Sequence, residues 1–113
     1  MKLPGAGAAT IDSAKVRDYL FSKSHPVGRF KASFFASLGY APARWELLRD
    51  DLNALAREEH AVTGPRTSYG QKYEVRGSLT GPNGRSAAVV TVWIILHGES
   101  SPRFVTAFPG VKT

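Results

Sequence analysis

The spacing of hydrophobic residues changes once along the chain, and this change constrains the fold more than any other feature of the sequence. In the first half, apolar side chains recur every three or four residues, as in Trp45, Leu48, Leu52 and Leu55. This is the period of an α-helix with one buried face. Over residues 71–80 polar and apolar side chains alternate instead, which is the period of a strand. The sequence therefore predicts helices followed by a sheet, which is an α+β fold.

The first half predicts three helices, at residues 13–22, 28–38 and 43–59. Asp12 or Ser13 can cap the first helix, and Gly39 suits the position just after the second. Residues 1–10 are small and rich in glycine, so we expect a flexible lead-in to a single domain over residues 11–113. With 42% apolar residues among 113, the chain is long enough to bury one hydrophobic core.

The second half predicts three strands, at residues 71–80, 86–97 and 103–108. Glycine and proline within residues 81–84 indicate a tight turn, and the composition of residues 61–70 indicates a loop. Short connections of this kind join antiparallel strands. The predicted architecture is therefore three N-terminal helices packed on one face of a C-terminal antiparallel meander.

The alternation in the longest strand assigns its two faces. Its apolar side is formed by Val90, Val92, Ile94 and Leu96, and we expect this side to pack against the helices. The open face of the sheet would then carry Arg76, Thr91, Trp93, Arg103 and Thr106. Cations beside an aromatic ring on an open sheet suit phosphate contact and base stacking. The alternative is a partly solvated face with one ordinary exposed tryptophan.

The charge balance raises the expectation of an anionic partner without deciding it, because many small basic domains bind nothing anionic. Fifteen Lys and Arg against nine Asp and Glu give a net charge of +6, which is typical of domains that meet nucleic acid. The stretch SHPVGRFK, residues 24–31, places His25, Arg29 and Lys31 at the start of the second predicted helix. Cations are slightly unfavourable at a helix N-terminus, which is already partly positive. Either the stretch is a solvated turn, or the charge is held there for an anion.

Several other classes of site are not indicated by the sequence. The chain has no cysteine, so neither a disulfide nor a thiolate site is available. The three histidines, His25, His60 and His97, have no recognisable metal-ligand spacing, and the turn at Gly81–Gly84 is a hairpin rather than a phosphate-binding loop. No cofactor is expected.

The longest apolar run, Ala87–Leu96, is too short to cross a bilayer, and the N-terminus is a poor secretory signal, so we expect a cytoplasmic protein.

Long stretches of the chain resemble a known family. The stretches are KVRDYLFSKSHPVGRFKASFFASLGY, YGQKYEVRGSLTGPNGR and TVWIILHGESSPRFVTAFP. From Ile11 to Pro109 they resemble small bacterial domains of unassigned function, with Phe108 where the family pattern more often has tyrosine. They are also similar to C-terminal toxin domains of bacterial polymorphic toxins, which share the barnase/EndoU/colicin/RelE (BECR) nuclease fold.

The resemblance implies a metal-independent, toxin-type ribonuclease that cleaves RNA by attack of the 2′-hydroxyl. It also implies an immunity or antitoxin protein as partner, and action in the cytoplasm, either that of its own cell or that of a target cell. The alternative is a non-catalytic basic module on the same scaffold that binds nucleic acid or protein, because a shared fold does not fix a function.

Two sets of residues are candidates for this chemistry. The catalytic candidates are His25, Lys31, Arg76, Thr91 and Arg103. The substrate-binding candidates are Arg29, Tyr69, Trp93 and Thr106. Among them His25 can serve as proton donor or acceptor, or it can simply order its turn. Arg29 can bind two phosphate oxygens at once, whereas Lys31 acts as a point charge.

Overall fold

The computed structural model describes residues 1–21 and 26–110, with the backbone alone at positions 19 and 26–30. Its elements in chain order are η1 (Ala6–Ala8), η2 (Lys15–Leu20), α1 (Pro26–Ser37), η3 (Pro42–Arg44), α2 (Trp45–Glu58), β1 (Ala61–Arg66), β2 (Gly70–Thr80), β3 (Ser86–Leu96) and β4 (Arg103–Pro109). Helical segments therefore precede an antiparallel sheet, which confirms the α+β class. None of the helices in the described part of the chain is long and apolar enough to cross a membrane.

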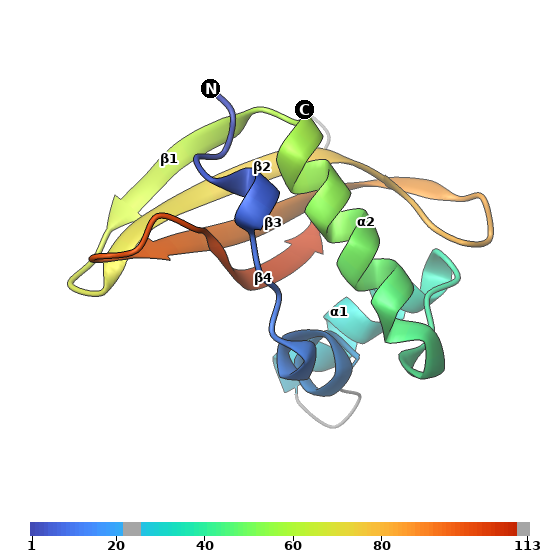
Figure 1. The fold of residues 1–113 in the computed structure, drawn as a ribbon. Coiled ribbons are helices and arrows are strands. Elements are labelled where there is room, and N and C mark those ends of the chain that lie inside the picture. Colours follow the sequence, from blue (N-terminus) through green and yellow to red (C-terminus); the bar gives the residue numbers. More distant parts are fainter. Residues whose placement is uncertain (22–25, 111–113) are drawn as a thin grey trace.

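The sheet has the strand order β1-β2-β3-β4, and each strand is antiparallel to its neighbours. The helix α2 crosses one face of the sheet and contacts β2, whereas α1 lies beside β4, an edge strand (Figure 1). The predicted strands are confirmed as β2, β3 and β4, with ends that differ by a single residue.

The loop predicted for residues 61–70 is wrong in its first part, because Ala61–Arg66 forms β1. This strand pairs with β2 and has a β-bulge between Thr63 and Arg66. The bulge contains Gly64 and Pro65, residue types that otherwise indicate a loop. Proline is tolerated in edge strands and bulges because its missing N–H is not needed there. The sheet therefore has a fourth strand that the composition concealed.

The segment expected as a flexible lead-in contributes to the packed structure. Leu3 is 3% exposed and belongs to the core. The Met1 carbonyl accepts a hydrogen bond from the Ala61 amide, and Thr10 forms a parallel bridge with Arg103. Residues 1–10 thus contact the beginnings of both edge strands.

The helical segments follow the predicted order with differences at their ends. The first is the π-helical segment η2, which covers only part of the predicted span of 13–22. Asp12 Oδ1 accepts a hydrogen bond from the Ala14 amide at 2.9 Å, the type of cap that was predicted. The third begins with the single turn η3 at Pro42, where a missing N–H has no cost.

The strand β3 presents to the helices the face opposite to the one predicted. Thr91 and Trp93 are fully buried, whereas Val92 and Ile94 are half-buried on the other face. The expectation that Thr91 and Trp93 lie on the open face is therefore wrong. Because β3 is apolar on both faces, its alternation alone could not identify the core side. The indole packs in the core, where it removes more apolar surface from water than a valine would.

A short hydrogen-bond chain allows this indole to be buried. Trp93 Nε1 donates to Thr91 Oγ1 at 2.8 Å, and the Thr91 hydroxyl donates to the Val75 carbonyl at 2.9 Å. The Trp93 ring packs edge-to-face against Phe104, with ring centroids 5.4 Å apart. An unpaired polar group in such a core would be destabilising, so Thr91 has a structural role beneath the sheet surface.

The turn between β2 and β3 holds the C-terminal end of α1. Gly39 has a φ of 95° and ends the helix in the left-handed conformation, as predicted. The Asn83 amide donates to the Leu38 carbonyl at 3.3 Å, and Asn83 Nδ2 donates to the Ser37 carbonyl at 3.0 Å. These are carbonyls that a helix end leaves unpaired. The turn therefore fixes the end of α1 relative to the sheet.

A buried tyrosine joins the end of α1 to α2. Tyr40 is 3% exposed, and its hydroxyl donates to Asp51 Oδ2 at 2.5 Å. Burial, together with the hydrogen bond to the Asp51 carboxylate, raises the pKa of Tyr40 far above its usual range. The hydroxyl therefore keeps its proton in the folded protein.

Replacing this tyrosine is expected to change the stability of the domain in alkaline solution. A tyrosine in the unfolded chain ionises at about pH 10. The pKa of Tyr40 is higher in the folded protein than in the unfolded chain. The stabilisation provided by the protonated Tyr40 hydroxyl is therefore complete below about pH 10 and is lost as the pH rises further. Tyr40→Phe should cost about 1–3 kcal/mol at neutral pH and lack this alkaline loss. Urea unfolding at neutral and alkaline pH measures both effects, and Tyr69→Phe, on a 74% exposed side chain, is the control. If Tyr40→Phe and the wild type lose the same stability at alkaline pH, Tyr40 is not the source of that loss.

Candidate functional site

The register of the strands defines the side chains that share the open face of the sheet. Residues paired across antiparallel strands point to the same side. The middle row consists of Val62, Glu74, Val92 and Thr106. The rows on either side consist of Lys72, Ile94 and Arg103, and of Arg76, Val90 and Phe108, of which Val90 is only 2% exposed. The open face is thus an aliphatic strip along β3 with charged and polar side chains on the flanking strands.

One contact joins this face to a helix. Lys31 Nζ donates to Thr106 Oγ1 at 2.9 Å, although the two residues are 75 positions apart in the sequence. The bond is partly buried and forms because α1 lies beside β4. An ammonium group and a hydroxyl at this spacing can both donate to the oxygens of one phosphate. The fold therefore brings together two of the residues predicted for phosphate contact.

The two arginines of the open face are each paired with a glutamate. Arg76 contacts Glu74 at 3.3 Å. Arg103 donates to both carboxylate oxygens of Glu99, at 3.0 and 2.7 Å, and this hydrogen bonding with the nearby negative charge raises the pKa of Arg103. An anion that binds Arg103 through both Nε and Nη2 must therefore displace Glu99.

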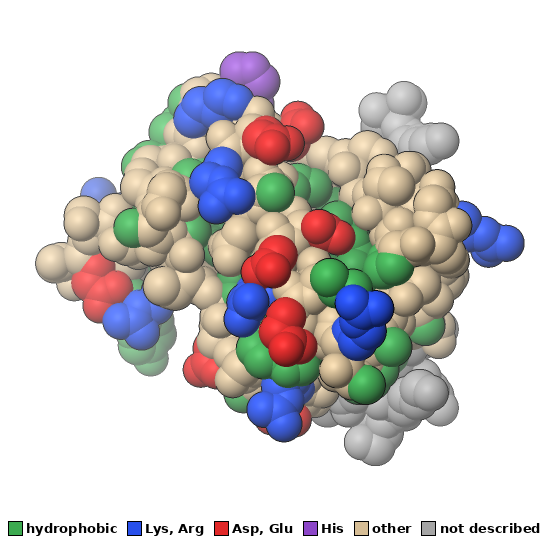
Figure 2. Space-filling model, turned by 45° about the vertical axis from the view of Figure 1, so that its right-hand side comes forward, with side chains coloured by type: hydrophobic (Ala, Val, Ile, Leu, Met, Phe, Trp, Pro, Cys, Tyr) green, Lys and Arg blue, Asp and Glu red, His purple; other side chains and the backbone are tan. Residues whose placement is uncertain are grey.

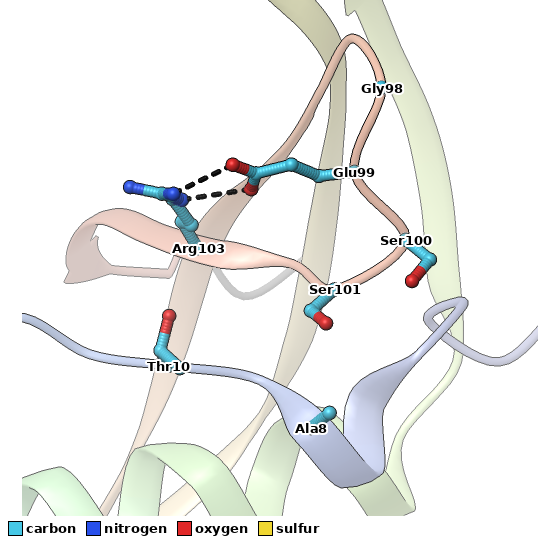
Figure 3. Close-up of a pocket in the computed structure, with 7 residues that line it drawn as sticks. All are labelled: Ala8, Thr10, Gly98, Glu99, Ser100, Ser101 and Arg103. Carbon is cyan, nitrogen blue, oxygen red and sulfur yellow. Dashed lines mark hydrogen bonds and ion pairs between the residues drawn. The ribbon is translucent and has the colours of Figure 1, made fainter.

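A hollow of about 400 Å³ lies beside Arg103, between the N-terminal segment and the β3–β4 turn. Figure 3 shows its hydroxyl groups, from Thr10 on the N-terminal segment and from Ser100 and Ser101 on the turn. Hydroxyls and a guanidinium can bind an oxyanion, although the Glu99 carboxylate also lines this hollow and competes for Arg103. The hollow therefore extends the polar surface beyond the edge of β4.

The charges are distributed unevenly between α2 and the rest of the chain. Residues 45–59 carry five acidic and two basic side chains, a balance of −3, whereas the other residues carry thirteen basic and four acidic, a balance of +9. On the surface over α2, acidic and basic side chains are interspersed (Figure 2). A polyanion is therefore attracted to the surface outside α2 more than to α2 itself. Among residues 1–21 and 26–110, no three His, Asp or Glu side chains are grouped in a way that could hold a metal ion.

Comparison with known proteins places the sequence in a family. A model of a domain of unknown function, DUF6883, matches residues 2–111. The chain belongs to the DUF6883 family. No curated protein matches it.

One solved structure is similar to this DUF6883 domain over nearly its whole length. It is a chain of a contact-dependent growth inhibition toxin–immunity protein complex from Klebsiella pneumoniae 342, and it superposes with a TM-score of 0.75. The match covers 96% of this chain and 98% of the other at 19% sequence identity. At this identity the similarity establishes a shared fold.

The DUF6883 domain brings together only part of the predicted site. Lys31, Arg76, Arg103 and Thr106 lie on or beside the open face. Tyr69 is exposed near the β1–β2 turn, where its carbonyl accepts a hydrogen bond from the His97 amide. That turn is at the end of the sheet, away from the middle row.

Of the four other candidates, two are buried beneath this face, and the other two have no described side chain. Thr91 and Trp93 are buried beneath it. His25 lies outside the described residues, and Arg29 is described by its backbone alone, within α1. The roles predicted for His25 and Arg29 therefore remain predictions.

The prediction from sequence also missed a residue in the middle row. Glu74 lies opposite Val92, which in turn lies opposite Thr106. The alternation of Lys72, Glu74 and Arg76 along β2 already placed the three side chains on one face. The missing information was the register, which shows that Glu74 and Thr106 share a row.

Proposed function

We propose that this DUF6883 domain is a metal-independent ribonuclease of the toxin type, with a BECR-like fold. The observation that carries the proposal is the Lys31–Thr106 contact on a face that also holds Arg76 and Arg103. Cations and hydroxyl donors arranged around one position stabilise the charge that develops on a phosphate under attack. The fold shared with a chain of a toxin–immunity complex supports the same class.

In this proposal each described side chain has a simple task. Lys31 and Thr106 donate to the non-bridging oxygens of the phosphate that is cleaved. Arg76 and Arg103 attract the neighbouring phosphates of the strand. His25, which lies outside the described residues, directly precedes α1 in the sequence, and it keeps the proton-transfer role predicted from the sequence.

We also propose an immunity or antitoxin protein as partner, and the cytoplasm of the producing or target cell as the place of action. The similar solved structure is of a toxin–immunity complex, and a ribonuclease that acts on cellular RNA must be neutralised where it is made. The excess of basic side chains outside α2 favours an acidic partner surface.

Loss of either member of the Lys31–Thr106 contact is expected to slow RNA cleavage. Lys31→Met keeps much of the length of the side chain and removes the charge, and Thr106→Val removes the hydroxyl at nearly constant volume. Each should lower the cleavage rate about 10²–10³-fold, the scale for loss of one donor to a developing oxyanion. The measurement is cleavage of total RNA and tRNA with a chelator present.

The control variant is Thr80→Val, because Thr80 Oγ1 bonds Ser86 Oγ at the exposed end of β2, away from the middle row. It should cleave RNA as the wild type does. If the wild type binds RNA and never cleaves it, the domain is the non-catalytic basic module instead. Cleavage by Lys31→Met and Thr106→Val at the rate of the control would show that the contact is structural.

A further inference from the structure

The carboxylate of Glu74 occupies the centre of the charged open face, and we propose that it is the general base that removes the proton from the ribose 2′-hydroxyl. This inference rests on the proposed ribonuclease function and adds a residue to it. Glu74 on β2 pairs with Val92 on β3, and Val92 pairs with Thr106 on β4. All three side chains therefore point out from the same row of the sheet.

The spacing across this row suits a single nucleotide. Adjacent strands lie about 4.7–4.9 Å apart, so the Cα atoms of Glu74 and Thr106 are separated by roughly 9–10 Å across β3. Side chains of glutamate and lysine extend several ångströms from either side. A phosphate held at Lys31 and Thr106 therefore leaves room over Val92 for a ribose whose 2′-hydroxyl can face β2 and the carboxylate.

The surroundings of Glu74 match the needs of this step. Lys72 and Arg76 precede and follow it on the same face of β2, and Lys31 lies across the row at Thr106. A carboxylate can accept a proton from a hydroxyl, while the surrounding cations stabilise negative charge on the phosphate. The half-buried Val92 and Ile94 provide an apolar floor for the ribose.

A second glutamate, Glu99, shows how a carboxylate with both oxygens engaged lies in this protein. Glu99 holds Arg103 through both oxygens, at 3.0 and 2.7 Å. Glu74 meets Arg76 through Oε2 alone, at 3.3 Å, and within the described part of the chain its Oε1 has no hydrogen-bond partner. The two side chains are similarly exposed, at 37% for Glu74 and 38% for Glu99. Glu74 therefore has an oxygen available to a substrate, whereas both oxygens of Glu99 are engaged.

The proposed step is balanced without any additional reagent. Glu74 takes the proton of the 2′-hydroxyl, and the 2′-oxygen forms a bond to phosphorus. The bond from phosphorus to the 5′-oxygen breaks, and that oxygen receives a proton from solvent water. The products are a 2′,3′-cyclic phosphate and a 5′-hydroxyl, and no electron is transferred.

The test compares Glu74→Gln with Glu99→Gln, a control matched in charge, exposure and pairing with arginine. The substrate is a short DNA oligonucleotide with one ribonucleotide, incubated in the presence of a chelator, with the 2′-O-methyl version as a ligand that cannot react. Glu74→Gln should lower kcat about 10²–10⁴-fold, the range for loss of a general base, with KM changed by only a few-fold. Glu99→Gln should keep kcat within about threefold, and because it releases Arg103 to bind phosphate, its effect should be a lower KM. Thermal unfolding confirms that both variants are folded.

The outcomes separate this inference from the proposal on which it rests. If the wild type forms the cyclic phosphate and Glu74→Gln cleaves as fast as Glu99→Gln, the ribonuclease assignment stands and Glu74 is not its base. A rise in KM at constant kcat would make Glu74 a binding residue and also overturn the inference. If the wild type cleaves no RNA, the proposed function fails, and the role of Glu74 fails with it.

Discussion

Trp93→Ala is expected to remove about 3–5 kcal/mol from the free energy of unfolding, the usual cost of deleting a large buried aromatic side chain. The indole is fully buried, packs on Phe104 and satisfies its N–H at Thr91. Domains of this size are commonly stable by only about 5–15 kcal/mol, so the variant should lie close to the limit of folding. Urea unfolding followed by circular dichroism measures the change.

The chain contains a matched control for this experiment in its other tryptophan. Trp45 is half-buried, with Arg49 at 5.1 Å and Arg17 at 5.9 Å from its ring centroid. Trp45→Ala should cost about 1–2 kcal/mol, because it loses cation–π contacts and only part of its buried area. If Trp93→Ala unfolds at the urea concentration of the wild type, Trp93 does not lie in the core, and its predicted contact with bases becomes plausible again.

Gly81→Ala is expected to be the other strongly destabilising change, at about 3 kcal/mol, the upper end of the usual cost of overpacking. A Cβ atom at position 81 would lie 1.9 Å from the Leu38 carbonyl oxygen. The obstacle is backbone, so the β2–β3 turn and the end of α1 must move apart. That movement also weakens the hydrogen bonds from Asn83 to the end of the helix.

The glycine experiment has a consequence for function as well as for stability. Because α1 carries Lys31, displacement of the helix should lengthen the contact with Thr106 and reduce RNA cleavage even at temperatures where the variant is folded. Gly7→Ala is the control, since an added Cβ there has no atom within 4 Å, and it should be nearly neutral. Wild-type stability and cleavage in Gly81→Ala would show that the turn does not fix α1.

Much of the fold followed from short-range patterns. The change of hydrophobic period separated helices from strands, and Gly39 marked the end of α1 as predicted. The turn at residues 81–84 joined β2 to β3. These features depend on neighbours within a few residues, so the sequence carries them directly. Where local signals conflicted, as at Gly64 and Pro65 in β1, the composition indicated a loop and pairing with β2 decided otherwise.

The candidate site, like the fold, was determined partly by the sequence and partly by the tertiary structure. The sequence determined which side chains could meet an anion, and it selected Lys31 and Thr106 individually. Only the tertiary structure decided that they touch, since their contact depends on α1 lying beside an edge strand 75 positions away. It also decided that Trp93 is core and Glu74 is surface. A strand that is apolar on both faces carries no local sign of its inner side, so the helices that pack on it and the register of its neighbours make that choice.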